Sequence, residues 1–298
     1  MRYLLLACIL LASPLAVADL RVFACEPEWA ALVRELGRDR VQVTAATGAL
    51  QDPHHIQARP SLIARLRKAD LLVCTGADLE IGWLPVLLRR AANPRVQPGQ
   101  AGHFMATDYV TLLDVPESVD RALGDVHPQG NPHIQTDPHN MLPVARALGA
   151  RLAELDAGHA ADYRQWTEDF LHRWQQALAG WDQRARTLKG LRVVTQHKGW
   201  VYLGHWIDWQ VVARLEPRPG VPPSAAHLAQ VLQTVREHPV DGIVRAAYQP
   251  ARPAEWLHQR TGLPVVVLPF TVGGSKEARD LFSLYDDTLS RLETLRHD

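Results

Sequence analysis

The chain alternates short apolar runs with longer segments in which apolar residues recur at every third or fourth position. Short apolar runs are typical of buried strands, and the recurring pattern is typical of helices that bury one face. Strands are predicted at Leu20–Cys25, Val41–Thr47, Asp70–Thr75, Arg192–Gln196, Gln210–Leu215, Gly242–Ala247 and Pro264–Pro269. Helices are predicted up to Leu36 and at Ser61–Lys68, Ser224–Glu237, Pro253–Thr261 and Lys276–Arg296. This order of elements predicts an α/β protein with parallel sheets covered on both faces.

One predicted helix is much longer than the others. The segment Ala160–Leu188 has no proline and a single glycine, and its aromatic residues recur at spacings of three and four. We predict one rigid helix that joins two doubly wound α/β lobes, in place of a flexible linker. The expected organisation is a signal peptide (1–18), a first lobe (19–158), a linker helix (159–188) and a second lobe (189–298).

The amino terminus has the pattern of a secretory signal peptide. Arg2 precedes the apolar run Leu4–Leu11, and Ala16-Val17-Ala18 stands directly before Asp19. A positive start, a short apolar segment and small residues at the cleavage point indicate export, here to the periplasm, with cleavage near Ala18. The run is shorter than the roughly 20 residues of a membrane-spanning helix. The alternative is a buried first helix.

Composition and charge narrow the class of protein. Apolar residues make up 47% of the chain, which is enough for a sizeable core, and 32 basic residues balance 32 acidic ones. This balance argues against a nucleic-acid binder, since such proteins carry a basic excess. The 14 histidines stand outside that balance, and their role is the open question.

Two cysteines, Cys25 and Cys74, follow the predicted signal peptide, and each ends a predicted strand. In an oxidising compartment they form either a disulfide between neighbouring strands or two separate buried thiols. A zinc–thiolate site would require a second cysteine close in sequence, and neither cysteine has one.

Three histidines come directly after predicted strands or close the irregular stretch of the first lobe: His54, His133 and His197. In open parallel sheets, ligands bind beyond the carboxyl ends of the strands, so we expect these imidazoles to converge. Neutral imidazole nitrogens suit Zn²⁺, and three of them leave one coordination position for an acid or for water. The flanking histidines His55, His127 and His139 are expected to support these ligands or to contact the metal transiently.

The histidines lie within motifs that resemble a known family. Asp52-Pro53-His54, Gly130-Asn131-Pro132-His133 and Gln196-His197-Lys198-Gly199-Trp200 occur in that order, and Leu215-Glu216-Pro217 and Val272-Gly273-Gly274 follow. Each motif is weak alone, but the ordered set covers essentially the whole chain after the predicted signal peptide. It is similar to the cluster A-I, or zinc-uptake, family of periplasmic solute-binding proteins, which serve ABC importers of zinc and manganese.

The resemblance implies that metal is held in the cleft between two lobes by His54, His133 and His197. Three histidines favour zinc, since manganese members tend to replace one histidine by a carboxylate. Many members add an acid from the loop after the last strand; here we expect Asp280 as fourth ligand, with water as the rival. The implied partner is a membrane permease with its cytoplasmic ATPase. The metal is expected to arrive either directly from solution or from a periplasmic zinc chaperone, and a monomer is expected.

Two readings from other classes remain open at this point. Three histidines and a metal-bound water also occur in zinc hydrolases, but the sequence has no H-E-x-x-H motif and no nearby glutamate in the position of a general base. An adhesin-like surface protein would need a lipid anchor or surface signal, and the sequence shows neither. We therefore expect a binding protein with no catalytic residues.

Overall fold

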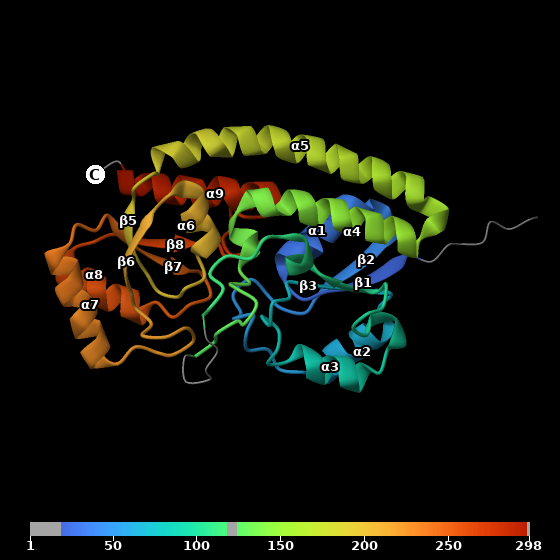
Figure 1. The fold of residues 1–298 in the computed structure, drawn as a ribbon, viewed down its shortest axis with the longest axis horizontal. Coiled ribbons are helices and arrows are strands. Elements are labelled where there is room, and N and C mark those ends of the chain that lie inside the picture. The colour runs from blue at the N-terminus through green and yellow to red at the C-terminus, as the bar shows by residue number, and fades with distance from the viewer. Residues whose placement is uncertain (1–18, 118–123, 297–298) are drawn as a thin grey trace, which may run out of the picture.

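The computed structural model describes residues 19–117 and 124–296. The predicted signal peptide, residues 1–18, lies outside the described residues. Two lobes, each built on a four-stranded parallel sheet, lie side by side beneath the long helix α5 (Ala160–Thr187). Figure 1 shows this helix arching over both lobes on the side away from the loops that meet between them. The predicted α/β fold with a joining helix is confirmed.

The first lobe has the strand order β2-β1-β3-β4, with every pair parallel. Its strands are β1 (Leu20–Ala24), β2 (Val41–Ala45), β3 (Leu71–Cys74) and β4 (His103–Met105). Its helices are α1 (Pro27–Gly37), α2 (Pro60–Lys68), α3 (Leu84–Ala91) and α4 (Met141–Leu155). Alternate strand residues face opposite sides: Val22 and Val73 pack with α1 and α4, whereas Phe23 and Leu72 pack with α2 and α3.

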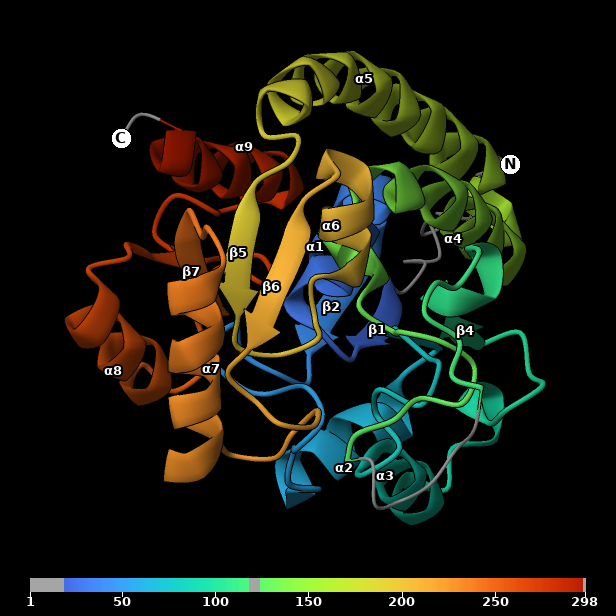
Figure 2. The same cartoon turned by 60° about the vertical axis from the view of Figure 1, so that its left-hand side comes forward.

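The second lobe repeats this arrangement with the strand order β6-β5-β7-β8. Its strands are β5 (Arg192–Thr195), β6 (Gln210–Arg214), β7 (Gly242–Ala246) and β8 (Val265–Leu268). Its helices are α6 (Val201–Ile207), α7 (Ala225–Glu237), α8 (Arg252–Thr261) and α9 (Leu281–Glu293). Figure 2 shows β5 and β6 with α7 and α6 beside them. In both lobes the chain order reverses beside the first strand, and a crevice forms there at the carboxyl ends of the strands.

The helix α5 is held by its aromatic face. Tyr163, Phe170 and Trp174 are fully buried in a core cluster that includes residues of both lobes, of α1, of α4 and of α9. The Trp174 indole N–H donates to the Pro138 carbonyl at 2.9 Å, and the Trp181 indole N–H donates to Asp286 of α9 at 2.8 Å. This continuous core packs both lobes against the helix α5. No helix among the described residues is both long and apolar enough to span a membrane.

Every strand predicted from the sequence is present, with ends that differ by at most two residues. The prediction missed the short β4 and the helices α3, α4 and α6, whose sequences are interrupted by proline or glycine or have little amphipathic pattern. The last helix begins at Leu281, five residues later than predicted, since Asp280 caps it. Single turns of 3₁₀ helix lie at Arg38–Arg40, Pro94–Val96, Ala106–Tyr109, Ile134–Thr136, Pro138–Asn140, Ala157–His159 and Thr294–Arg296.

The two cysteines form a disulfide, which decides between the two alternatives left by the sequence. Cys25 directly follows β1 and Cys74 ends β3, and their Cα atoms lie 4.8 Å apart. Both residues are fully buried between neighbouring strands. The bond closes a loop of 49 residues and fixes the strand ends from which the polar loops of the first lobe emerge.

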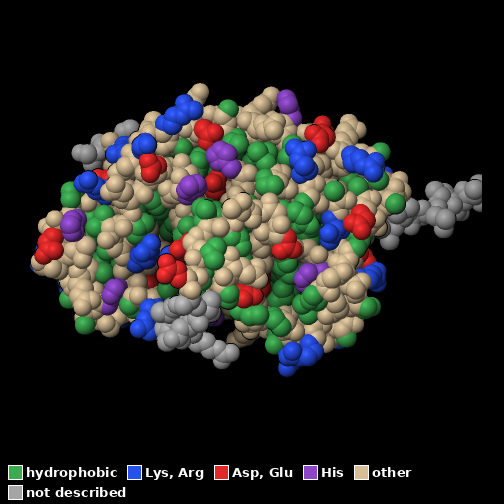
Figure 3. All heavy atoms as spheres, viewed as in Figure 1, with side chains coloured by type: hydrophobic (Ala, Val, Ile, Leu, Met, Phe, Trp, Pro, Cys, Tyr) green, Lys and Arg blue, Asp and Glu red, His purple; other side chains and the backbone are tan. Residues whose placement is uncertain are grey.

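The surface reflects the even charge of the sequence. On the face seen in Figure 3, basic and acidic side chains are interspersed over both lobes and do not form a field of one sign. On this face, attraction of a cation or anion therefore depends on local arrangements of side chains.

Candidate metal centre

The three predicted histidines converge between the lobes. Their ring centres form a nearly equilateral triangle, 5.3 Å from His54 to His133, 5.6 Å from His54 to His197 and 5.5 Å from His133 to His197. One nitrogen of each ring lies within 4.8 Å of the others, and all three side chains are buried. Three nitrogen donors from two lobes therefore face one point, as a tetrahedral zinc site requires. We call them the histidine triad.

His54 is presented by the loop between β2 and α2. Its Nδ1 lies 2.8 Å from Oδ1 of Asp52, which also accepts from the His54 backbone N–H at 3.0 Å. The intervening Pro53 stiffens the loop, and its carbonyl accepts from the indole N–H of Trp83 at 2.8 Å. With Nδ1–H donating to Asp52, the lone pair of His54 lies on Nε2, which is buried without a hydrogen-bond partner among the described residues.

His133 comes from the irregular segment between β4 and α4 and is held in the boundary between the lobes. The Asn131 side chain accepts from the His133 backbone N–H at 3.1 Å and donates to the carbonyl of Lys198 at 2.9 Å. The Tyr202 hydroxyl donates to the Asn131 carbonyl at 2.7 Å. Phe270 of the second lobe packs edge-on against the His133 ring, with ring centres 5.2 Å apart. The second lobe therefore positions a histidine of the first.

His197 follows β5 in the second lobe. Its Nδ1 lies 2.7 Å from Oε2 of Glu216, which follows β6, and this pairing leaves Nε2 to face the triad. The same carboxylate accepts from the backbone N–H of Gly220 at 3.0 Å. Asp52 and Glu216 therefore fix the tautomers of two histidines in the same way, one in each lobe.

Burial favours a neutral imidazole at His133. Loss of solvation lowers the pKa of His133 well below its ordinary value, and the neighbouring histidines lower it further. For Asp52, burial alone would raise the pKa, but the hydrogen bond and charge of His54 outweigh burial and lower it. A carboxylate that accepts from Nδ1–H, as Asp52 does here, is the arrangement that supports a metal-binding histidine.

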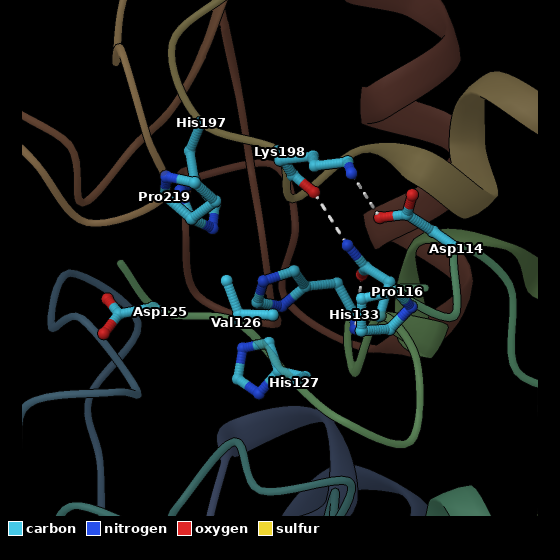
Figure 4. Close-up of a pocket in the computed structure, with 10 residues that line it drawn as sticks. Asp114, Pro116, Asp125, Val126, His127, His133, His197, Lys198 and Pro219 are labelled. Atoms are coloured by element: carbon cyan, nitrogen blue, oxygen red, sulfur yellow. Dashed lines mark hydrogen bonds and ion pairs between the residues drawn. The ribbon is translucent and has the colours of Figure 1, made fainter. Parts of the chain in front are cut away.

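A fourth histidine lies over the triad. The ring centre of His127 is 5.4 Å from that of His54 and 6.3 Å from that of His133. Both ring nitrogens of His127 are buried without a hydrogen-bond partner among the described residues, and burial lowers the pKa of the ring to about 4. In Figure 4, His127 and His133 point into the same pocket, which His197 and Lys198 also line.

Two loops from opposite lobes meet beside this pocket. The Asp125 backbone N–H donates to the Pro219 carbonyl at 3.0 Å, and Lys198 forms a 2.7 Å ion pair with Asp114. Gly124 and Gly220 have positive φ angles, and a Cβ atom at either would come within about 2.2 Å of an oxygen of the opposite loop. Glycine is therefore required at both positions for this contact.

The other predicted site residues lie elsewhere. His55 is 64% exposed and its Nε2 lies 3.6 Å from Asp125, at the edge of the site. His139 uses both ring nitrogens away from the triad, with Nδ1 2.7 Å from Asp137 and Nε2 3.4 Å from Asp182 of α5. Acids on both sides raise the pKa of His139, whereas burial lowers the pKa of His133 in the triad.

The expectation for Asp280 needs correction. Its side chain is exposed and forms the N-cap of α9, where Oδ1 accepts from the Ser283 backbone N–H at 2.8 Å and from the Ser283 hydroxyl at 2.7 Å. A reciprocal cap at a helix start is a stable local use for an aspartate. The structure therefore does not bring Asp280 to the triad as a fourth ligand.

Sequence reasoning overlooked the roles of Asp52 and Glu216. Asp52 stands two residues before His54, and that spacing was a usable signal, because the same Asp-Pro-His pattern recurs at Asp137-Pro138-His139 with the same hydrogen bonds. Glu216 lies 19 residues from His197, and only the pairing of β5 with β6 brings the two together. No local pattern could have indicated that contact.

Comparisons with known proteins identify the family of this chain. Residues 22–295 match the family described as zinc-uptake complex component A, periplasmic. The chain is 22% identical to the high-affinity zinc uptake system protein ZnuA of Bacillus subtilis over 262 residues, 87% of this chain and 80% of that protein. It is 24% identical to the zinc-binding lipoprotein AdcA of Streptococcus pneumoniae over 273 residues, 87% of this chain and 52% of that protein.

The fold has close counterparts among solved structures. A crystal structure of a ZnuA protein superposes with a TM-score of 0.75 at 20% identity and covers 93% of this chain and 98% of the other. At that identity the likeness concerns the fold. The family match extends over nearly the whole described chain, and the chain belongs to the family of periplasmic zinc-uptake component A proteins.

Proposed function

We propose that this protein is the exported zinc-binding subunit of an ABC-type metal importer, which captures Zn²⁺ between its lobes and delivers it to a membrane permease. The observation that carries the proposal is the histidine triad. Three buried imidazoles come from both lobes and present nitrogens to one point, and carboxylates orient two of them. Zinc held there joins the lobes, so it binds the closed form better than an open one.

The donor set supports zinc over manganese. His54, His133 and His197 offer nitrogen, whereas Mn²⁺ sites favour carboxylate and water oxygens. Asp52 and Glu216 are already engaged with the Nδ1 atoms of two of these histidines. We propose that the fourth position is filled by water or by His127, whose free nitrogens face the same pocket.

The family and the zinc-uptake relatives support a proposal for the biological setting. We propose export to the periplasm after cleavage near Ala18, work as a monomer, and a permease with a cytoplasmic ATPase as partner. Zinc reaches the site from solution or from a periplasmic zinc chaperone. The protein is proposed to have no enzymatic activity, because Asp52 and Glu216, the two acids that contact the triad, are engaged with histidine Nδ1 atoms and are not placed to act as a general base.

Zinc titration against a competing chelator tests the proposal. The wild-type protein is expected to bind one zinc per chain tightly, and elemental analysis of protein purified from the exporting compartment without added metal is expected to find zinc. A matched control is His172→Ala, which removes an exposed histidine of α5 that is not part of the triad.

The hydrolase alternative is tested on the same zinc-loaded protein. Ester, phosphate and lactam substrates are expected to react at the rate of the buffer alone. Turnover that disappears when zinc is removed and in a His133→Ala variant would contradict a pure binding role. Purification with manganese in place of zinc would contradict the assignment of the cargo.

A further inference from the structure

A second cluster of buried polar side chains lies close to the histidine triad and has no role in the function described above. Glu26, Glu28 and Glu80 are only 3%, 2% and 2% exposed. Among the described residues, no lysine, arginine or histidine forms an ion pair with any of them, and their electrostatic neighbours are one another. Buried carboxylates without a basic partner are rare, because burying an unbalanced charge is costly.

Backbone N–H groups and the N-terminus of a helix balance part of the negative charge of these glutamates. Glu80 accepts from the backbone N–H groups of Thr75 at 2.7 Å and of Gly76 at 3.2 Å. Glu26 and Glu28 stand at the start of α1, whose N-terminus supplies the equivalent of about half a positive charge. That is too little for three carboxylates, so the cluster needs protons or a cation.

Within the described part of the chain, two atoms at this cluster lack a hydrogen-bond donor, and both are oxygen acceptors. Oε2 of Glu26 accepts from the Thr75 hydroxyl at 3.1 Å, and the Glu26 and Glu80 carboxyls share a side-chain hydrogen bond, but no N–H or hydroxyl donor among the described residues reaches Oε1 of Glu26. Oε1 of Gln135 is also buried without a partner, and this residue is only 2% exposed. Two free oxygens in a buried acidic cluster call for a group that donates hydrogen bonds or carries positive charge.

One small cavity between the lobes, which we call the acidic cavity, is lined by Glu26, Glu28 and Gln135. It has space for about one water-sized particle. The first lobe adds Thr47 and Gln51 to the lining, and the second lobe adds Tyr248, Phe270 and Thr271. The Thr271 hydroxyl donates to the Glu28 carboxylate across the boundary. The polar groups that line this cavity offer oxygen to an ion, and none of its side chains contributes a basic nitrogen.

From this arrangement we propose a second cation site, distinct from the histidine triad, in which Glu26, Glu28 and Gln135 bind a hard divalent cation such as Mn²⁺, Mg²⁺ or Ca²⁺. Such ions take carboxylate and amide-carbonyl oxygens and fill remaining positions with water. Zinc prefers the nitrogen donors of the triad, so the two sites sort metals by donor type. A cation in the cavity also joins the lobes, since Glu28 already contacts Thr271.

The site is tested on crystals of the full zinc-loaded chain soaked in Mn²⁺. Anomalous scattering recorded at the manganese and zinc absorption edges is expected to place manganese in the acidic cavity and zinc at the triad. The two peaks are scored separately. Absence of zinc at the triad would contradict the proposed function, whereas a water or an empty cavity in place of manganese would overturn the second site, whatever the triad holds.

Solution measurements with variants provide the second arm. Zinc-loaded wild-type protein is expected to bind one additional Mn²⁺ per chain, measured from the free-ion electron paramagnetic resonance signal. Glu26→Gln is expected to weaken this binding by at least about tenfold, because affinity for a hard cation depends on ligand charge. The matched control is Glu168→Gln, an acid of α5 whose side chain is 71% exposed, and it is expected to bind Mn²⁺ as the wild type does.

A purely structural role for Glu26 predicts a different pattern. Replacing a buried acid by glutamine removes a charge and keeps the fold, so the thermal stability of the metal-free variant should be equal or higher. Only a ligand role predicts that the increase in stability on adding Mn²⁺ is lost in Glu26→Gln and kept in Glu168→Gln. An equal increase in both variants would overturn the proposal.

Discussion

The histidine triad and the acidic cavity lie in the same boundary between the lobes, and they balance their polar groups in opposite ways. In the triad, each of two imidazoles donates to a carboxylate and keeps a lone pair free. At the cavity, three glutamates lie together without a basic partner among the described residues, and two of them, Glu26 and Glu28, line it. One site is prepared for a metal by hydrogen bonds that fix donor nitrogens, and the other holds negative charge that only protons or a cation can balance.

The comparison also separates what each lobe contributes. The triad takes His54 and His133 from the first lobe and its connection, and His197 from the second. The acidic cavity takes both lining carboxylates from the start of α1 in the first lobe, and the second lobe contributes hydroxyl groups and two aromatic rings. Closure of the lobes therefore completes the nitrogen site directly, whereas it mainly covers the oxygen site.

The largest expected effect is that of removing a triad histidine. His133→Ala should weaken zinc binding by more than about 100-fold, since loss of groups that merely support a ligand already costs about 10- to 100-fold. Competition with a chelator measures the change, with His172→Ala as control. An affinity within a factor of three of the wild type would remove His133 from the site.

A smaller effect is expected at the carboxylates that orient the triad. Glu216→Gln keeps the shape of the side chain but removes the charge that holds the Nδ1–H of His197. Zinc affinity is expected to fall by about 10- to 100-fold. The same titration with Glu237→Gln, an exposed acid at the end of α7, supplies the control. Equal affinities of the two variants would show that orientation of His197 does not depend on Glu216.

The acidic cavity predicts that the stability of the metal-free protein depends on pH. Burial raises the pKa of Glu28 from 4.5 to about 7, so the folded metal-free protein keeps a proton that the unfolded chain releases. Stability should therefore fall as the pH rises from about 4.5 to about 7, by at most about 1.4 kcal/mol per pH unit. Glu28→Gln removes this loss, so its stability relative to the wild type should increase over that range.

This difference is measured by denaturant unfolding of both proteins without metal at a series of pH values. The buried histidines are common to both proteins, so their titration cancels in the comparison. A constant difference between wild type and variant from pH 4.5 to 7 would show that Glu28 ionises normally in the folded protein.

The smallest effect concerns Asp280. Asp280→Ala removes the cap of α9 and should lower the free energy of unfolding by about 1 kcal/mol. Zinc affinity and coordination number should stay unchanged, because the side chain is engaged with Ser283. Loss of zinc affinity without loss of stability would restore Asp280 as a ligand.

Much of the fold was predictable because its signals are local. The strand β3 is fully apolar, the other core strands β1, β5 and β7 are mostly apolar, and the aromatic spacing of α5 extends over most of its length. The missed helix α3 has prolines and glycines on either side of it, and β4 has only three residues. Elements so short are determined by the sheet on which they pack.

The site was predictable only in part, because some of its contacts leave no local signal in the sequence. His54, His133 and His197 could be chosen because parallel strands bring their carboxyl ends together. Glu216 and the glutamates of the cavity could not, since their contacts depend on side-chain packing between elements and between lobes. Asp280 was misplaced because the start of α9 was predicted five residues early, which hid its role as a helix cap.

The central claim is that zinc binds the triad through nitrogens from both lobes. The most direct measurement is a crystal structure of the zinc-loaded protein with anomalous scattering recorded at the zinc edge. The account predicts one strong peak about 2.0–2.1 Å from Nε2 of His54, Nε2 of His197 and a ring nitrogen of His133. A zinc ion bound elsewhere, or bound by histidines of one lobe alone, would contradict it.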